Sequence, residues 1–194
     1  MGRPSSCAGC GRSGILDAVP DRIRLLTHDD APALSELRLR SRASLAPWEP
    51  IRHPDHDTPA GQRADLDAAL AQHARGQGVP LAILDDDGSV AGRLDLNAIV
   101  RGAFESCAMG YWLAADRTGR GLATAAVRAA VSLAFDDLGL HRVEAGTLLR
   151  NHASQAVLAR AGFTRYGLAP RYLRIAGEWQ DHVLFQRLAD DPPS

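Results

Sequence analysis

The stretch between residues 109 and 139 constrains the fold of this chain more than any other. Apolar residues at 109–113 predict a strand, and the polar residues at 116–120 predict a turn. Four apolar residues then recur at spacings of four, three and four, as on one face of a helix that begins near Leu122: Val127, Val131, Ala134 and Leu138. Gly139 is typical of the residue that follows a helix. The chain therefore predicts a strand that leads through a short turn into a long helix.

The turn carries two glycines, in the order Thr118-Gly119-Arg120-Gly121. The first N–H groups of a helix have no partner within the helix, and glycines let a ligand approach the main chain closely. Such a helix start favours a phosphate group. An ordinary strand-to-helix turn fits the same residues. A nucleotide-binding Rossmann unit is a third interpretation, because Glu144 follows at a suitable spacing, but position 124 is threonine instead of glycine and three predicted strands precede the motif.

Composition bounds the size and the partners of the protein. With 194 residues, of which 45% are hydrophobic, the chain is long enough for one buried core and short for two domains. A formal net charge of -1 gives no general attraction to nucleic acid or to an anionic membrane, so small molecules or proteins are the expected partners. No apolar run reaches the length of a membrane span, and the first residues lack a signal-peptide core. We therefore expect a cytoplasmic protein.

The three cysteines argue against a disulfide framework, since their number is odd and no export signal accompanies them. Cys7 and Cys10 have the spacing of half a zinc site, but no second ligand pair follows, so no metal is expected. Glycines and serines oppose order in the same region. We therefore expect residues 1–20 to form a flexible extension and residues 21–190 to form the folded domain.

The remaining segments give the order of elements along the chain. Strands are expected at residues 22–27, 79–84, 90–99, 109–113, 141–149, 163–175 and 178–188. Helices are expected at residues 33–45, 60–75, 122–138 and 152–161, the first capped by Thr27 or Asp29 and the last by Asn151. The order β-α-α-β-β-β-α-β-α-β-β predicts a mixed α/β (α+β) fold around one central sheet.

The order and the motifs together resemble the GNAT superfamily of acetyltransferases over residues 22–188. The family motif Gln/Arg-x-x-Gly-x-Gly/Ala aligns with residues 118–123, where Thr118 departs from the pattern. Asn151 with Ser154, and the segment 158–163, resemble two further family elements. The RimJ/RimL type, which acetylates α-amino groups of ribosomal proteins, looks most similar at residues 46–48, 110–113, 140–145, 171–173 and 181–183. The resemblance implies a single GNAT-type domain with a mostly antiparallel central sheet flanked by helices.

The resemblance also implies where acetyl-CoA binds. Its pyrophosphate is expected on the main chain of the helix start: Thr118, Gly119, Arg120, Gly121, Leu122 and Ala123. Its pantetheine is expected along the strand edge at Tyr111 and Leu113, where a main-chain amide polarises the thioester. Asn151 either contacts the pantetheine as well or only caps its helix. This arrangement requires the two central strands, ending at Leu113 and Leu149, to splay apart, assisted by a bulge in the fourth strand.

Direct attack by an amine on the thioester needs a base. Glu144 is the first candidate, and pairing with Arg142 or with solvent is the alternative role of its carboxylate. Glu105 and His182 are weaker candidates. One RimL-type arrangement uses a glutamate just before a Tyr-Leu pair of the sixth strand. Here that residue is Arg171, so this base does not carry over.

The departing thiolate needs a proton donor, and Ser154 matches the serine of the family at the start of its helix. The alternative is that Ser154 only bonds to Asn151 in the first helical turn. Cys107 offers an acetyl-enzyme route, but no neighbour in the sequence activates its thiol, and packing within its strand is the preferred interpretation. We therefore expect direct transfer in a ternary complex, with Glu144 and Ser154 as the catalytic residues.

The expected acceptor is the α-amino group of a protein N-terminus, whose ordinary pKa of about 7.7–8.0 makes it easier to deprotonate than lysine at about 10.4. Trp48 and His182 are its expected contacts, although Trp48 also fits the role of an anchor packed on the core. A small amine, such as an antibiotic or a polyamine, is the alternative acceptor. A non-catalytic module that binds acetyl-CoA is an alternative of a different class. The sequence leaves a homodimer open.

Overall fold

The computed structural model describes residues 22–192, so the expected extension at residues 1–20, with Cys7 and Cys10, lies outside the described part of the chain. Seven strands form one sheet in the order β1-β2-β3-β4-β5-β7-β6. The strands are β1 (Ile23–Leu25), β2 (Val79–Leu84), β3 (Val90–Val100), β4 (Ser106–Leu113), β5 (Arg142–Leu148), β6 (Thr164–Ile175) and β7 (Glu178–Leu188). The α-helices are α1 (Ala31–Leu45), α2 (Pro59–Ala74), α3 (Leu122–Ser132) and α4 (His152–Arg160). The predicted order of elements is confirmed.

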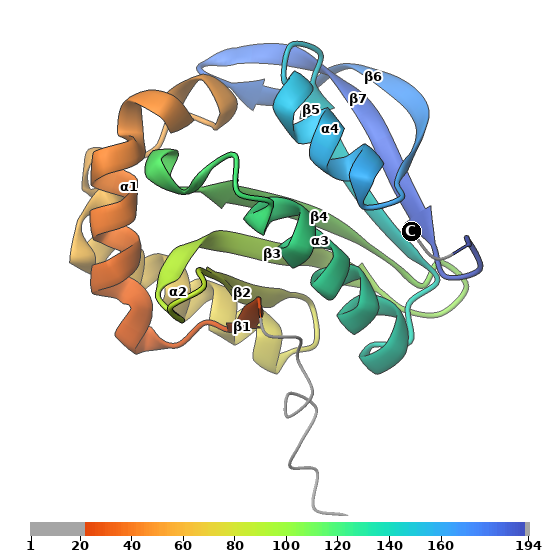
Figure 1. The fold of residues 1–194 in the computed structure, drawn as a ribbon, viewed down its shortest axis with the longest axis horizontal. Helices are drawn as coiled ribbons and strands as arrows, with labels where there is room; N and C mark the ends of the chain where they lie inside the picture. Colours follow the sequence, from red (N-terminus) through yellow and green to blue (C-terminus); the bar gives the residue numbers. More distant parts are fainter. Residues whose placement is uncertain (1–21, 193–194) are drawn as a thin grey trace, which may run out of the picture.

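The helices cover the two faces of the sheet (Figure 1). In this view α3 and α4 lie in front of the sheet, while α2 lies behind it and α1 runs along its left side. Every strand pair is antiparallel except β4 with β5. A Rossmann unit requires a parallel sheet, so that interpretation of the glycine turn is wrong.

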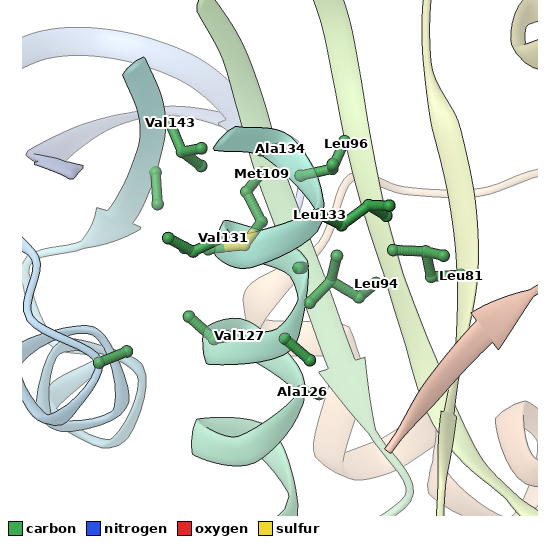
Figure 2. Packing of buried hydrophobic residues seen from close by; sticks show 14 of the residues in the cluster. Leu81, Leu94, Leu96, Met109, Ala126, Val127, Val131, Leu133, Ala134 and Val143 are labelled. Carbon is green, nitrogen blue, oxygen red and sulfur yellow. The ribbon is translucent and has the colours of Figure 1, made fainter. Parts of the chain in front are cut away.

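The face of α3 that the sequence predicted to be apolar packs against the middle of the sheet. Figure 2 shows Val127, Val131 and Ala134 of this helix among Met109 and Val143 of the two central strands, and all five are buried. The helix ends differently from the prediction, because the α-helical part stops at Ser132. A five-residue π-helical turn, Leu133–Asp137, follows. The wider turn still ends at the expected glycine, whose φ of 60° places it in the left-handed region.

The two central strands splay apart as expected. They pair in parallel at only three positions, Ser106 with Arg142, Cys107 with Val143, and Ala108 with Glu144. Beyond Ala108 the strands β4 and β5 share no further pair. The bulge expected in the fourth strand is a wrong prediction: β4 pairs with β3 in unbroken register at residues 108–113, and the extra residue lies in β3, between Asn97 and Val100.

The physical reason for this correction is the backbone of Ala98, whose φ of 50° lies in the left-handed region. One residue in that conformation lets a strand carry an extra residue without losing its pairing. The start of α1 also differs from the prediction, since Asp30 is its N-cap and Thr27 precedes a short 3₁₀ turn (His28–Asp30). A carboxylate oxygen of Asp30 accepts a hydrogen bond from the Thr27 main-chain N–H at 2.8 Å, which satisfies a donor at that helix start.

A buried ion-pair network fixes the segment between α1 and α2. Arg38 is 4% exposed, and its guanidinium donates to Asp57 at 2.7 Å and to Glu49 at 2.7 Å. The same guanidinium lies 5.4 Å from the centre of the Trp112 ring of β4. Burial alone would raise the pKa of Asp57, but hydrogen bonds from Arg38, His56 and Arg42 outweigh it and hold that pKa far below its ordinary value. The segment is therefore anchored to both α1 and the sheet.

Candidate active site

A cavity of about 1010 Å³ lies at the end of β4, next to α3 and α4. Its wall includes β4, the turn after it, the first two turns of α3, one side of α4 along its length and the end of α1. Ten of the residues predicted for the site line it: Trp48, Tyr111, Leu113, Thr118, Gly119, Gly121, Leu122, Ala123, Asn151 and Ser154. The structure thus brings the cofactor residues expected from the motifs together in one place.

The glycine turn shapes one end of this cavity. Gly119 and Gly121 have φ values of 77° and 82°, and a Cβ added at either position would meet no atom within 4 Å. Ala125 donates to the Gly121 carbonyl at 3.0 Å, so the N–H groups of the preceding first turn of α3 have no helical partner. Open space beside unpaired N–H groups at a helix start fits a phosphate group.

Arg120 belongs to the glycine turn, but its side chain points away from the cavity. Its guanidinium donates to Asp85 at 2.8 Å and to Asp86 at 3.0 Å, in the hairpin between β2 and β3. Asp85 accepts hydrogen bonds from Arg120, from the Asp86 main chain and from Arg117. Together they hold the pKa of Asp85 at about 2, and the bond from Arg120 contributes most. The side chain of Arg120 therefore anchors the glycine turn to the hairpin, and only its main chain remains for a ligand.

Two arginines that the sequence reasoning missed also line the cavity, Arg128 of α3 and Arg160 of α4. The Arg128 guanidinium donates to the Arg160 carbonyl at 2.6 Å, which links the two helices. No aspartate or glutamate is among the residues that line this cavity. The pattern placed Arg128 off the apolar face of its helix, but only the position of α4 shows what it faces. The positive charge without a carboxylate suits an anion.

Tyr111, Ser154 and Asn151 form a chain of hydrogen bonds where β4 faces α4. The Tyr111 hydroxyl lies 2.8 Å from the Ser154 hydroxyl, and the Ser154 main-chain N–H donates to the Asn151 side chain at 3.1 Å. Asn151 is therefore the N-cap of α4, as predicted. Burial raises the pKa of Tyr111 to about 12, so its phenol stays protonated at neutral pH. The main chain of Ser154 serves the cap, while its hydroxyl stays in the cavity wall with a protonated partner.

Glu144 does not line this cavity. It pairs with Ala108, and side chains alternate between faces along a strand, so both residues lie on the sheet face opposite Met109 and Tyr111. One carboxylate oxygen of Glu144 accepts a hydrogen bond from the Tyr166 hydroxyl at 2.7 Å and lies 3.8 Å from the Arg142 guanidinium. The carboxylate thus has the expected arginine partner, and Glu144 itself belongs to the last pair of the two central strands.

His182 also lies outside the cavity. It is 3% exposed in β7, and its Nδ1 donates to the Gln180 carbonyl at 3.0 Å. Its ring meets the Tyr172 ring edge to face, with 5.5 Å between the ring centres. Gly146 of β5 is the small residue beneath this pair, since an added Cβ would lie 3.6 Å from Tyr172 and 3.7 Å from His182. His182 therefore positions an aromatic side chain on the sheet face of Glu144.

Neither Cys107 nor Glu105 is placed as a reactive group in the cavity. Burial, aided by the charge of Glu144, raises the pKa of the Cys107 thiol to about 12, which leaves almost no thiolate at neutral pH. The acetyl-enzyme alternative therefore lacks an activated nucleophile. Glu105 lies in the turn before β4 with a φ of 40°, and its carbonyl accepts the His141 N–H at 2.8 Å.

Trp48 lies in the cavity wall and is not packed in the core, so the alternative role of a core anchor is wrong. It lines the cavity, is 40% exposed, and lies 5.6 Å from the Arg150 guanidinium that stacks on its ring. Arg150 also donates to the Pro47 carbonyl at 3.2 Å and to the Gln180 side chain at 3.1 Å. The Trp48 segment is thereby joined to the last hairpin of the sheet.

Residues 22–192 contain no helix that is both long and apolar enough to cross a membrane. In the same part of the chain, no three His, Cys, Asp or Glu side chains are grouped so that they could hold a metal ion.

Comparison with known proteins agrees with this geometry. Residues 22–164 match the family model described as an acetyltransferase (GNAT) domain. A ribosomal protein uS5-alanine N-acetyltransferase of Escherichia coli is 34% identical over 163 residues, which cover 84% of each chain. The solved structure of Mycobacterium smegmatis RimJ in complex with CoA-disulfide has a TM-score of 0.85 and 35% identity, covering 89% of this chain and 83% of that one.

The structure of ribosomal-protein-S5-alanine acetyltransferase from Vibrio fischeri has a TM-score of 0.82 and 32% identity, with 87% of this chain and 93% of that chain covered. This chain therefore has the same overall fold as these two solved structures. The chain belongs to the GNAT family of acetyltransferases, and it is an N-acetyltransferase that takes its acetyl group from acetyl-CoA.

Proposed function

We propose that the acceptor of the acetyl group is the α-amino group of a protein N-terminus, of the kind carried by ribosomal proteins, and that the enzyme works in the cytoplasm. The observation that carries this proposal is the similarity, at 34% identity over 84% of both chains, to an enzyme named for the alanine of ribosomal protein uS5. The exposed sheet face of Glu144, Tyr166 and Tyr172 supports it, because an extended peptide has room there.

The experiment is incubation of the full chain with acetyl-CoA and a panel of peptides and amines, with mass spectrometry to locate the added acetyl group. The panel contains peptides that begin with alanine or serine, the same peptides with a blocked N-terminus, a lysine side-chain substrate and a polyamine. Acetylation confined to free N-termini is the expected result. Acetylation of the polyamine alone would show that the acceptor is a small amine. Binding of acetyl-CoA without transfer to any amine would show that the protein is a non-catalytic module.

Different residues of the cavity bind different parts of acetyl-CoA. The thioester of acetyl-CoA supplies an acetyl group activated for attack by an amine. The main chain from Thr118 to Ala123 binds the pyrophosphate, and the β4 edge at Tyr111 and Leu113 orients the pantetheine together with Asn151. Ser154 holds a proton for the thiolate, and its hydroxyl is kept in place by the Tyr111 phenol at 2.8 Å. No covalent enzyme intermediate is needed, so both substrates are bound together.

Arg128 binds the 3′-phosphate of CoA in this proposal, because it is a guanidinium in the cavity wall two turns along α3 from the pyrophosphate site. We expect Arg128→Gln to weaken CoA binding about tenfold, the effect of losing one charge-assisted hydrogen bond, while binding of dephospho-CoA stays unchanged. Isothermal calorimetry with both ligands measures this. Arg63→Gln on α2 is the control, and an equal loss for both ligands would move Arg128 away from the 3′-phosphate.

Glu144 is the proposed general base, acting on the ammonium of the acceptor from the sheet face opposite the cavity. Loss of the carboxylate in Glu144→Gln should therefore depress turnover most at pH 6, where few α-amino groups are neutral, and the rate should partly recover towards pH 9. A pH–rate profile on one peptide tests this. Glu36→Gln, at an exposed position of α1, controls for charge. A profile that only scales the parent curve at every pH would remove Glu144 as the base.

A further inference from the structure

On the sheet face opposite the cavity, the middle of β4 is exposed. Ala108 and Gly110 are exposed there, although they belong to a central strand. A Cβ added to Gly110 would meet no atom within 4 Å, so open space lies directly above the strand. The pairing of β4 with β5 ends at Ala108, which leaves no strand beside Gly110 on that side. We call Ala108 and Gly110, with the space above them, the open patch.

Two carboxylates flank the open patch from the neighbouring strands. Asp95 of β3 pairs with Gly110, and Glu144 of β5 pairs with Ala108, so both side chains share the face of the open patch. Side chains at paired positions have Cβ atoms about 4.5–5.5 Å apart, so each acidic residue stands directly beside one residue of the open patch. The side chains of Asp95 and Glu144 are 23% and 29% exposed, which leaves both accessible to a ligand.

Near Asp95, two carboxylates share one guanidinium. The Arg93 guanidinium bonds to Asp95 at 2.9 Å and also to Asp65 of α2, so one cation serves two carboxylates. Burial raises the pKa of Asp95, while Arg93 opposes this and Asp65 adds to it. Arg52, from the segment between α1 and α2, acts only as a more distant charge. A cation that reaches the open patch therefore gains a partner that Arg93 does not fully neutralise.

The far side of the open patch is aromatic. Tyr166 and Tyr172 of β6 are 45% and 49% exposed, the first bonded to Glu144 and the second packed on His182. Aromatic rings give contact area to a peptide main chain and to its first side chain at low cost in entropy. The open patch thus has a carboxylate on each side, and aromatic rings lie beyond Glu144.

We propose that Asp95 binds the ammonium group of the acceptor over Gly110 and presents it to Glu144, an inference that rests on the proposed N-acetyltransferase acting on a free amino group. The Asp95 carboxylate accepts a hydrogen bond from the ammonium. Glu144 takes one proton: an N–H bond breaks, an O–H bond forms on Glu144, and the electron pair remains on the nitrogen for attack. Asp95 is thus a specificity residue, and Glu144 is the base.

The experiment measures binding separately from turnover. A short peptide that the enzyme acetylates is titrated into the enzyme saturated with CoA, once with a free N-terminus and once with that N-terminus acetylated. We expect the parent enzyme to prefer the free amine. Asp95→Asn should reduce that preference about 10- to 100-fold, the effect of one hydrogen bond between charged groups, and should raise KM far more than it lowers kcat.

Two further variants make the result decisive. Asp65→Asn leaves Arg93 to Asp95 alone without touching the open patch, so the preference for the free amine should fall, but less than in Asp95→Asn. Asn97→Asp adds a carboxylate opposite Ala108, at an exposed position of β3, and should strengthen the preference. Asp95→Asn with an unchanged melting temperature and an unchanged preference would overturn the inference. If the enzyme acetylates only a small amine, the proposed acceptor is wrong, and the same comparison with that amine still tests Asp95.

Discussion

Gly121→Glu is expected to lower the affinity for acetyl-CoA by about 100-fold or more while the chain stays folded. The new carboxylate would lie at the helix start where we propose that the pyrophosphate binds, and like charges placed together cost several kcal/mol. The fold should survive because an added Cβ meets no protein atom within 4 Å. The remaining cost is that of a side chain at a φ of 82°, about 1–2 kcal/mol.

A matched control separates the charge from this backbone strain. Gly102, in the turn between β3 and β4, has a φ of 75° and equally open surroundings, and it does not line the cavity. Gly102→Glu should therefore show the same strain and the same charge with normal binding. Calorimetry with acetyl-CoA and thermal melts of both variants provide the readout. Normal affinity in Gly121→Glu would place the phosphates elsewhere.

Ser154→Ala is expected to lower kcat about 100-fold, the lower end for general acid catalysis, while acetyl-CoA binding is largely retained. The reason is that the Ser154 hydroxyl stands in the cavity wall next to a phenol that stays protonated. Ser44→Ala is the control, since the Ser44 hydroxyl lines the same cavity but already donates to the Ser41 carbonyl at 2.7 Å. Steady-state kinetics and calorimetry together test this. A variant with weak binding and normal kcat would make Ser154 a binding residue only.

The fold could be predicted from sequence because its signals are local. Each helix and strand follows from hydrophobic period, caps and glycines: α3 begins at Leu122 and Asn151 caps α4, both as expected. The errors are also local in origin. The extra residue at Ala98 carries no glycine to mark it, and the π-helical turn at the end of α3 keeps the same apolar residues as an ordinary helix.

The residues that line the cavity could be named from the sequence, whereas those of the proposed acceptor site could not, for a physical reason. The glycine turn and Ser154 belong to contiguous motifs, so their roles are visible in short segments. Asp95 becomes notable only through its register with Gly110 and through a guanidinium shared with Asp65 of a distant helix. Arg120 differs, because its position in the motif predicts a phosphate contact. Its guanidinium instead binds Asp85 in the hairpin between β2 and β3, and the motif does not indicate this.

The narrow junction between β4 and β5 makes the stability of this enzyme depend on the supply of its own substrate. Within residues 22–192 the sheet is continuous there through three residue pairs only. At the proposed site acetyl-CoA would contact β4 and α4 together, and so would add bonds across the part of the sheet where strand pairing stops. Ligand at 100 times its Kd adds about 2.7 kcal/mol to the free energy of unfolding. A cell depleted of acetyl-CoA and CoA would therefore hold a less stable enzyme that proteases degrade faster.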